Sequence, residues 1–197
     1  MSRRMLKVNR PALLAGLAFF AFALPARAGQ DASVSPDVSR VSAGLFCAPP
    51  TAGRRDAPGT IAGWVHVPEA PVRLIAEGRV APAVLGLGFG VRYSLRQETD
   101  ASLRYTVTHP PMPPRGITEQ SWTGTLSAGS SDTVFFQFDT VEELQPGDWT
   151  FSVRQNGQPL FTIDFTVVPP AAAPGLADLC ARGPLLSASP SPPAAAG

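Results

Sequence analysis

Apolar and polar residues alternate through the middle of this chain. Every second position of one segment is large and apolar, namely Leu87, Phe89, Val91, Tyr93 and Leu95. A period of two is typical of a β-strand with one buried face. This pattern, or an apolar run of strand length, recurs in seven segments: 61–67, 84–97, 102–108, 117–126, 134–138, 149–153 and 159–167.

Turn residues separate these segments at intervals of about 8–12 residues, a spacing typical of sandwich folds. No stretch after residue 28 carries the 3.6-residue period of an amphipathic helix. The pattern therefore predicts an all-β protein, an immunoglobulin-like antiparallel β-sandwich of about seven strands.

Composition narrows the possible classes further. The 197 residues include 22 prolines and 18 glycines, and only 16% are charged, against about 25% in a typical soluble domain. These values exclude a coiled coil, a helical bundle and a wholly disordered charged tail. The formal charge of +1 offers no basic surface for nucleic acid, so we expect no nucleic-acid partner.

The first 28 residues have the three parts of a secretory signal peptide. A basic start with Arg3, Arg4, Lys7 and Arg10 precedes the apolar residues 11–24, and Ala26-Arg27-Ala28 matches a cleavage site. The apolar run is shorter than the roughly 20 residues of a membrane span. We expect cleavage near Ala28-Gly29, a periplasmic or secreted product, and no stable membrane insertion of the mature chain.

Removing this leader changes the charge. It takes away five basic residues and no acidic ones, which leaves 11 basic and 15 acidic residues and a formal charge of −4. Lys7 is the only lysine, so the mature chain lacks the residue needed for Schiff-base chemistry or a phosphate-binding loop. We expect no cofactor.

Two cysteines, Cys47 and Cys180, lie near the two ends of the mature chain. An even pair in an exported protein predicts a disulfide. A nucleophilic thiol would require a histidine partner, and a metal site would require clustered ligands such as Cys-x-x-Cys. Neither arrangement is present locally, so the structural bridge is favoured.

Composition also divides the mature chain. Residues 29–57 are polar and rich in Pro and Ser, and we interpret them as an irregular N-terminal segment. Residues 58–168 form the predicted sandwich. Residues 169–197 contain seven prolines and nine alanines and are interpreted as a tail, tethered near Cys180 by a short turn over residues 176–180.

The last two predicted strands allow two registers. Asn156-Gly157 is a strong signal for a two-residue turn, but that loop with regular pairing would place Phe161 and Phe151 on opposite faces. A three-residue loop over 155–157, with Gly157 left-handed in a bulge, pairs Phe151 with Phe161. We predict the three-residue loop.

Gly86, Gly88 and Gly90 form a stripe without side chains along one strand. A dinucleotide loop would need a following helix and a third glycine at the proper spacing, and both are missing. We therefore expect an aromatic side chain, Trp64 or Trp122, to cover the stripe. An uncovered stripe would be a groove for a partner strand or an extended ligand.

No recognisable catalytic set is present. His66 lies beside Trp64 in a predicted strand, where a packed, hydrogen-bonded histidine is expected. His109 and Met112 alone make an incomplete site for a soft metal, so we predict no metal. Neither a Gly-x-Ser-x-Gly nor a His-Glu-x-x-His motif occurs. Glu142 and Glu143 resemble solvated loop charges.

A proline-rich loop is the better candidate for binding, because consecutive prolines lose little entropy on binding. It comprises His109, Pro110, Pro111, Met112, Pro113, Pro114 and Arg115. The alternative is a stiff connector between two strands.

Several short motifs occur in one order along the chain: Gly44-Leu45-Phe46-Cys47, Pro58-Gly59-Thr60, Leu87-Gly88-Phe89-Gly90-Val91, Thr108-His109-Pro110-Pro111, Ser121-Trp122 and Pro146-Gly147-Asp148-Trp149. Over residues 44–168 the chain resembles an exported proteobacterial family known as domain of unknown function 3859. The resemblance implies a secreted or periplasmic β-rich domain and carries over no catalytic residues.

Two functional hypotheses follow. The first is a non-catalytic binding or accessory module of the cell envelope, which takes an envelope protein or an extended ligand. The second is a periplasmic hydrolase or metal-binding protein that gathers His66, His109 and carboxylates in space. A pocket containing both histidines and a carboxylate would favour the second.

Overall fold

A computed structural model describes residues 32–97 and 101–181. The predicted signal peptide, 1–28, and the predicted tail from residue 182 onward lie outside the described residues. Within the described ranges, no helix has the length and apolar character needed to cross a membrane.

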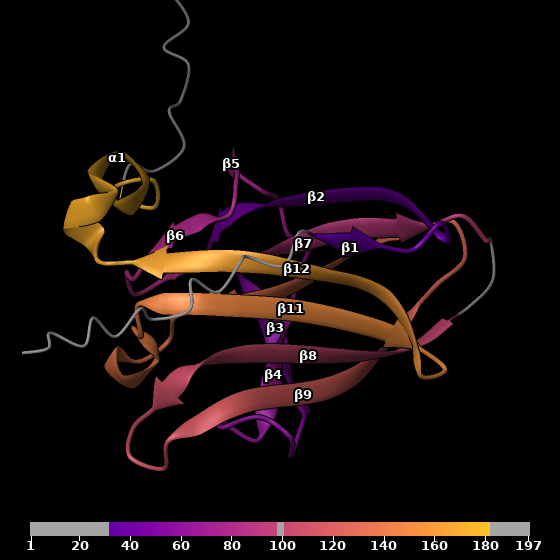
Figure 1. The fold of residues 1–197 in the computed structure, drawn as a ribbon, viewed down its shortest axis with the longest axis horizontal. Coiled ribbons are helices and arrows are strands. Elements are labelled where there is room, and N and C mark those ends of the chain that lie inside the picture. Colours follow the sequence, from indigo (N-terminus) through magenta and orange to yellow (C-terminus); the bar gives the residue numbers. More distant parts are fainter. Residues whose placement is uncertain (1–31, 98–100, 182–197) are drawn as a thin grey trace, which may run out of the picture.

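Two β-sheets pack face to face (Figure 1). Sheet I has the strand order β10-β7-β2-β5, and sheet II has the order β1-β12-β11-β8-β9, with β6 also paired to β12. Sheet I consists of β2 (Val38–Cys47), β5 (Ala76–Glu77), β7 (Leu87–Leu95) and β10 (Ser131–Gln137). Sheet II consists of β1 (Ser33–Val34), β6 (Val80–Pro82), β8 (Ala101–Met112), β9 (Ile117–Leu126), β11 (Gly147–Gln155) and β12 (Gln158–Val168).

Seven strands of the described chain are seven or more residues long. The first, second and fifth of them lie in sheet I, and the third, fourth, sixth and seventh lie in sheet II. This is the strand distribution of an immunoglobulin-like sandwich in which the fourth strand pairs with the third instead of joining the first sheet. The predicted fold class is confirmed, although β2 stands among these seven strands in place of the predicted strand 61–67.

The core lies between the two sheets, around Phe89 of β7. Its ring centroid lies 5.3 Å from that of Trp149, 5.6 Å from Phe151 and 5.2 Å from Phe165, all on sheet II. The alternate residues Leu87 to Tyr93 are almost fully buried, as the period of two predicts. Aromatic pairs at these distances add about 0.5–1.5 kcal/mol each beyond the area they bury.

The N-terminal segment is not irregular, in contrast to the prediction for residues 29–57. Strand β2 lies inside sheet I, where it pairs with β7 on one side and β5 on the other. Most residues of β2 are small or polar, and only Leu45 and Phe46 are large, buried apolar side chains. The sequence of β2 lacks a clear alternating pattern, because pairing with β7 and β5, rather than large apolar side chains of its own, holds the strand in sheet I.

The β11–β12 hairpin turns on two residues, and the predicted three-residue loop is therefore wrong. Gln155 opposes Gln158, which leaves Asn156 and Gly157 in the turn with φ values of 49° and 80°. Positive φ at both positions is the geometry of a type I′ turn, for which Asn-Gly is the preferred pair.

A bulge reconciles this turn with the hydrophobic pattern. Leu160 is an extra residue in β12 next to the register shift after Val153, and both Leu160 and Phe161 are buried. The shift places Ile163, not Phe161, opposite Phe151. Phe151 and Phe161 still share the core face, because the added residue restores the alternation that a regular two-residue hairpin would reverse.

The predicted disulfide joins Cys47 at the end of β2 to Cys180, with 5.4 Å between the Cα atoms. Cys180 follows two short helical turns, η2 (Pro170–Ala172) and α1 (Pro174–Ala177). Leu176 and Leu179 pack against the core from this segment. The described start of the predicted tail is therefore docked on the sandwich by both packing and a covalent bond.

One hairpin belongs to neither sheet. Strands β3 (Thr51–Asp56) and β4 (Trp64–Pro68) pair only with each other, and they cross the direction of β8 and β9 in Figure 1. The predicted strand 61–67 thus begins at Trp64. This hairpin lies over the side of the sandwich where β9 and β10 are the edge strands, and it forms the candidate site.

Candidate functional site

A cleft of about 720 Å³ lies beneath the β3–β4 hairpin. The hairpin and the segment that follows it supply one wall. Strands β8 and β9 supply a second wall, and β10 with the residues after it supplies the third. The cleft therefore collects residues from segments that are far apart in the sequence, on the side of the sandwich where the two sheets end.

Hydrogen bonds fasten the hairpin to the free edge of β9. The Arg55 guanidinium donates to the Thr123 carbonyl at 2.7 Å, and the Ser121 backbone N–H donates to the Gly59 carbonyl at 2.9 Å. The side-chain oxygen of Gln120 accepts from the Ile61 N–H at 2.8 Å. These contacts fix the distance between the hairpin and sheet II.

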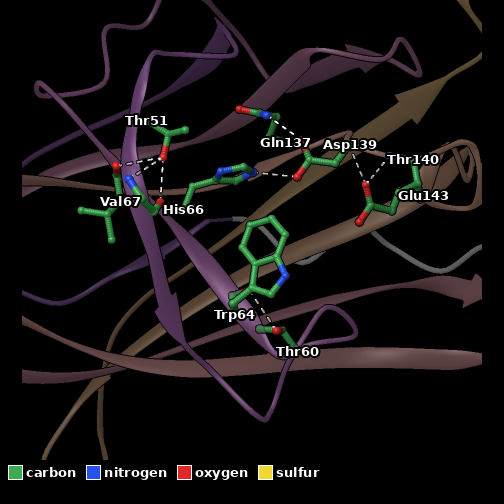
Figure 2. A network of polar contacts seen from close by, with 10 residues as sticks. Thr51, Thr60, Trp64, His66, Val67, Gln137, Asp139, Thr140 and Glu143 are labelled. Carbon is green, nitrogen blue, oxygen red and sulfur yellow. Dashed lines mark hydrogen bonds and ion pairs between the residues drawn. The ribbon is translucent and has the colours of Figure 1, made fainter.

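A second attachment joins the hairpin to the end of β10 (Figure 2). His66 Nε2 lies 2.7 Å from Asp139 Oδ2, and the Gln137 amide donates to Asp139 Oδ1 at 2.6 Å. The side chains of His66 and Asp139 are 20% and 33% exposed, so solvent weakens this contact. It positions the hairpin rather than contributing much to overall stability.

Glu143 supports Asp139 from the turn η1 (Val141–Glu143). Its Oε2 accepts the backbone N–H groups of Asp139 at 2.6 Å and Thr140 at 3.0 Å. Burial raises the pKa of Glu143, while these two backbone donors oppose that rise. The expectation that Glu143 is a solvated loop charge is wrong, because it caps a turn and lines the cleft.

Two tryptophans give the cleft an aromatic surface. The Arg54 guanidinium lies 3.7 Å from the ring centroid of Trp64, and Arg54 itself does not line the cleft. Trp122 stacks on Tyr105 with ring centroids 5.7 Å apart. Both indoles line the cleft and are half-buried, so each is held by a protein group while part of it stays accessible.

A tyrosine pair and a carboxylate lie behind this surface. The Tyr105 hydroxyl donates to Asp132 Oδ2 at 2.5 Å, and the Tyr93 hydroxyl lies 3.2 Å from that of Tyr105. Burial, followed by the charges of neighbouring groups, raises the pKa of both phenols. Both stay protonated as donors, and Asp132 is occupied as their acceptor, which is a structural role.

The glycine stripe is not part of this cleft. Gly86 lies in a turn before β7 with φ of 78°, and the Phe46 ring lies directly over Gly88. Gly90 faces the backbone of β10 at Val134 and Phe135. Phe46, rather than Trp64 or Trp122, thus covers Gly88, and β10 covers Gly90, so the part of the stripe within β7 offers no groove. A larger side chain at Gly88 would overlap the Phe46 ring.

The proline-rich segment joins β8 to β9, and its first four residues belong to β8, which continues to Met112. His109 and Met112 are 5% and 1% exposed, so neither is available to a partner. Gly116 donates its N–H to the Met112 carbonyl and closes a short turn between β8 and β9. Among the predicted loop residues, Pro111, Pro113, Pro114 and Arg115 are the exposed ones.

His109 is a core residue. Its Nδ1 donates to the Pro110 carbonyl at 2.8 Å, and its Nε2 accepts from the Gln120 amide at 3.2 Å. Its ring lies 4.9 Å from that of Trp149. Burial lowers the pKa of His109, so the ring is neutral and both nitrogens are engaged.

The hydrolase hypothesis requires His66, His109 and a carboxylate in one pocket, and the described residues do not form such a pocket. His66 lines the cleft, but His109 does not. In residues 32–97 and 101–181, no group of three or more His, Cys, Asp or Glu side chains could hold a metal ion. The residues brought together around His66 serve to anchor the hairpin.

Sequence reasoning did not identify Arg54, Arg55, Asp132 or Asp139 as site residues. Arg54 and Arg55 lie in the segment that was interpreted as irregular, and the two aspartates lie at the two ends of β10. The spacing of residues within a single segment does not identify these four residues, because the cleft depends on the path of the β3–β4 hairpin. The sequence does predict a role for Trp64 or Trp122, but as a cover for the glycine stripe rather than as walls of this cleft.

Residues 34–167 match the family described as "Domain of unknown function (DUF3859)". The chain belongs to the DUF3859 family. The match starts ten residues before the predicted start at residue 44 and includes all of β2, in agreement with the place of that strand in sheet I. The DUF3859 domain thus covers both sheets and the hairpin over the cleft.

Two solved structures are similar to this DUF3859 protein. An immunoglobulin-like protein from Pseudomonas aeruginosa is 21% identical, with a TM-score of 0.44, over 70% of this chain and 97% of that one. The alkylpurine DNA glycosylase AlkC from Pseudomonas fluorescens, bound to DNA containing an abasic site analog, is 17% identical, with a TM-score of 0.28, over 45% of this chain and 27% of that one. No curated protein matches the sequence.

Proposed function

We propose that this DUF3859 protein is an exported, non-catalytic binding module of the cell envelope and that the cleft under the β3–β4 hairpin is its ligand site. The observation that carries the proposal is the cleft itself. Its volume of about 720 Å³ falls within the roughly 300–1,000 Å³ of ligand pockets, which typically combine aromatic walls with a few placed polar groups.

The polar groups of the cleft support binding over catalysis. Asp132 accepts from two tyrosines, Asp139 contacts His66 and Gln137, and Glu143 caps a turn. Each of these three carboxylates thus has a structural partner, whereas a general acid or base must reach the substrate. Trp64 and Trp122 provide accessible surface for a ligand.

Two features support export. Residues 1–28 have the pattern of a cleaved leader, and the Cys47–Cys180 disulfide is of the kind that persists in oxidising compartments. N-terminal sequencing of the protein recovered from the exporting cell should read from Gly29. A mature chain that retains residue 1 would contradict the export proposal.

Photo-cross-linking in the exporting cell tests the site. A photoreactive amino acid replaces Thr125, an exposed residue lining the cleft, or Thr166, an exposed residue of β12 away from it. We expect a reproducible adduct from position 125 that is absent from position 166 and is lost in a Trp64→Ala background. Equal adducts from both positions, or adducts unaffected by Trp64→Ala, would contradict the site.

A further inference from the structure

We propose that the cleft receives an extended polypeptide segment, which adds to sheet I as a new strand along the free edge of β10. This inference rests on the proposed function and specifies its ligand class. In β-augmentation, main-chain hydrogen bonds hold the added strand, and pockets for alternate side chains select its sequence.

The direction of the β10 backbone follows from its last contacts. The Phe138 N–H donates to the Leu87 carbonyl at 3.1 Å, and the Phe138 carbonyl accepts from the Gly86 N–H at 2.9 Å. Residue 138 therefore faces β7. Because successive residues of an antiparallel strand alternate in direction, and β10 pairs with β7 without a register shift, the N–H and C=O groups of Phe135 and Gln137 point away from β7.

This free edge belongs to the cleft. All of Ser131–Gln137 lines it, and within the described residues no strand pairs with β10 on that side. The Thr133 N–H is satisfied by Asp132 Oδ1 at 2.8 Å. No hydrogen bond among the described residues reaches the backbone of Phe135 or Gln137 from the cleft side.

The edge of β9, on the opposite side of the cleft from β10, is covered by the hairpin. Strand β9 also ends its sheet, but the Gly59 carbonyl occupies its Ser121 N–H and Arg55 occupies its Thr123 carbonyl. Open edges invite pairing, and folded proteins generally cover them. Here the fold covers one of two facing edges and leaves the other open beside two tryptophans.

The chemistry of that edge favours a polypeptide. Its donors and acceptors repeat every second residue, which is the spacing that the main chain of an added strand matches. The walls present Trp64, Trp122 and Phe136, so the segment should carry apolar side chains at alternate positions. A sugar could stack on the indoles, but its binding would not require hydrogen bonds to the β10 backbone.

A matched pair of variants tests the backbone contact. Gln137→Pro removes the outward N–H, and proline is tolerated on an edge strand when its missing N–H faces away from the ladder. Gln137→Ala removes the same side chain but keeps the N–H. Peptides are selected from a displayed random seven-residue library on the full-length protein purified from the exporting cell, and their Kd values are measured by fluorescence polarisation.

Both variants lose the side-chain contact with Asp139, so the comparison between them isolates the backbone N–H. We expect selected peptides to bind Gln137→Pro at least about tenfold more weakly than Gln137→Ala, because a main-chain hydrogen bond is lost. Hydrogen exchange on the unmutated protein provides a second readout that does not depend on a variant folding. Peptide binding should slow exchange at the Phe135 and Gln137 amides and leave exposed amides of β12 unchanged.

Three results would overturn the inference. The first is that no peptide is enriched on the natural protein above a Trp64→Ala, Trp122→Ala double variant. The second is that both Gln137 variants bind peptides equally and the Phe135 and Gln137 amides stay unprotected, and the third is that the protein binds members of an oligosaccharide panel but no peptide. The adducts from position 125 separate this failure from that of the proposed function. If they persist while peptides fail, the cleft binds another class of ligand. If they are absent as well, the proposed site itself is wrong.

Discussion

Removing the Cys47–Cys180 bridge should cost this domain much of its stability. The bridge spans 133 residues of sequence. In the chain-entropy description, closing a loop of that size removes about 17 cal/mol/K from the unfolded state, or about 5 kcal/mol at 25 °C. Native domains have total unfolding free energies of about 5–15 kcal/mol, so the Cys47→Ser, Cys180→Ser double variant should lie near the limit of folding.

Urea unfolding of the oxidised protein and of this double variant measures the loss. We expect the free energy of unfolding to fall by about 3–5 kcal/mol, with the lower value allowing for structure in the unfolded chain. The m-value should rise, because an unfolded chain without the bridge exposes more surface. Each single Cys→Ser variant should match the double variant. A loss below about 1 kcal/mol with an unchanged m-value would refute the loop-closure reasoning.

Three further predictions concern the core and the hairpin. Gly88→Ala should destabilise by about 1–3 kcal/mol in urea because its methyl group overlaps Phe46, whereas Gly175→Ala, with open space around it, should change stability little; equal effects would contradict the packing. Because burial lowers the folded-state pKa of His109 below the ordinary 6.5, the unfolded state binds more protons, so stability should fall as pH drops through about 6.5. A His109→Gln variant should lose that part of the pH dependence, and an unchanged profile would contradict it. Asp139→Asn should lower global stability by less than about 1 kcal/mol yet speed hydrogen exchange in β4, and unchanged exchange there would show that this contact does not hold the hairpin.

The sandwich could be predicted because most of its strands carry their own pattern. Leu87 to Leu95 alternate so clearly that one face must be buried. Strand β2 could not be found in this way, since a central strand made largely of small and polar residues depends on partners that the local sequence does not show. The hairpin at Asn156 shows a different limit. In the sequence, a two-residue Asn-Gly turn and a shared core face for Phe151 and Phe161 look incompatible, but a bulge at Leu160 allows both.

The site was less predictable than the fold. His109 and Met112 have the chemistry of binding residues, but an unbroken β8 carries them into the core. The cleft instead depends on where the β3–β4 hairpin crosses the sandwich, and contacts such as Arg55 with Thr123 span 68 residues of sequence. Long-range packing of this kind leaves no periodicity in a single segment. Trp64 and Trp122 could be singled out as aromatic residues, but not paired across a common space.

The hairpin over the cleft also bears on how such a domain can diversify. Residues 51–68 form one continuous stretch of chain between two strands of sheet I, and they pair with neither sheet as a strand. A protein engineer can therefore keep the two sheets as a scaffold and replace only this stretch. Ile61 packs against the core and Ala57 is buried, so a library randomised only at the exposed positions of this stretch would alter the wall that faces a ligand and leave the core unchanged. Binding residues commonly lie on loops that a rigid scaffold positions.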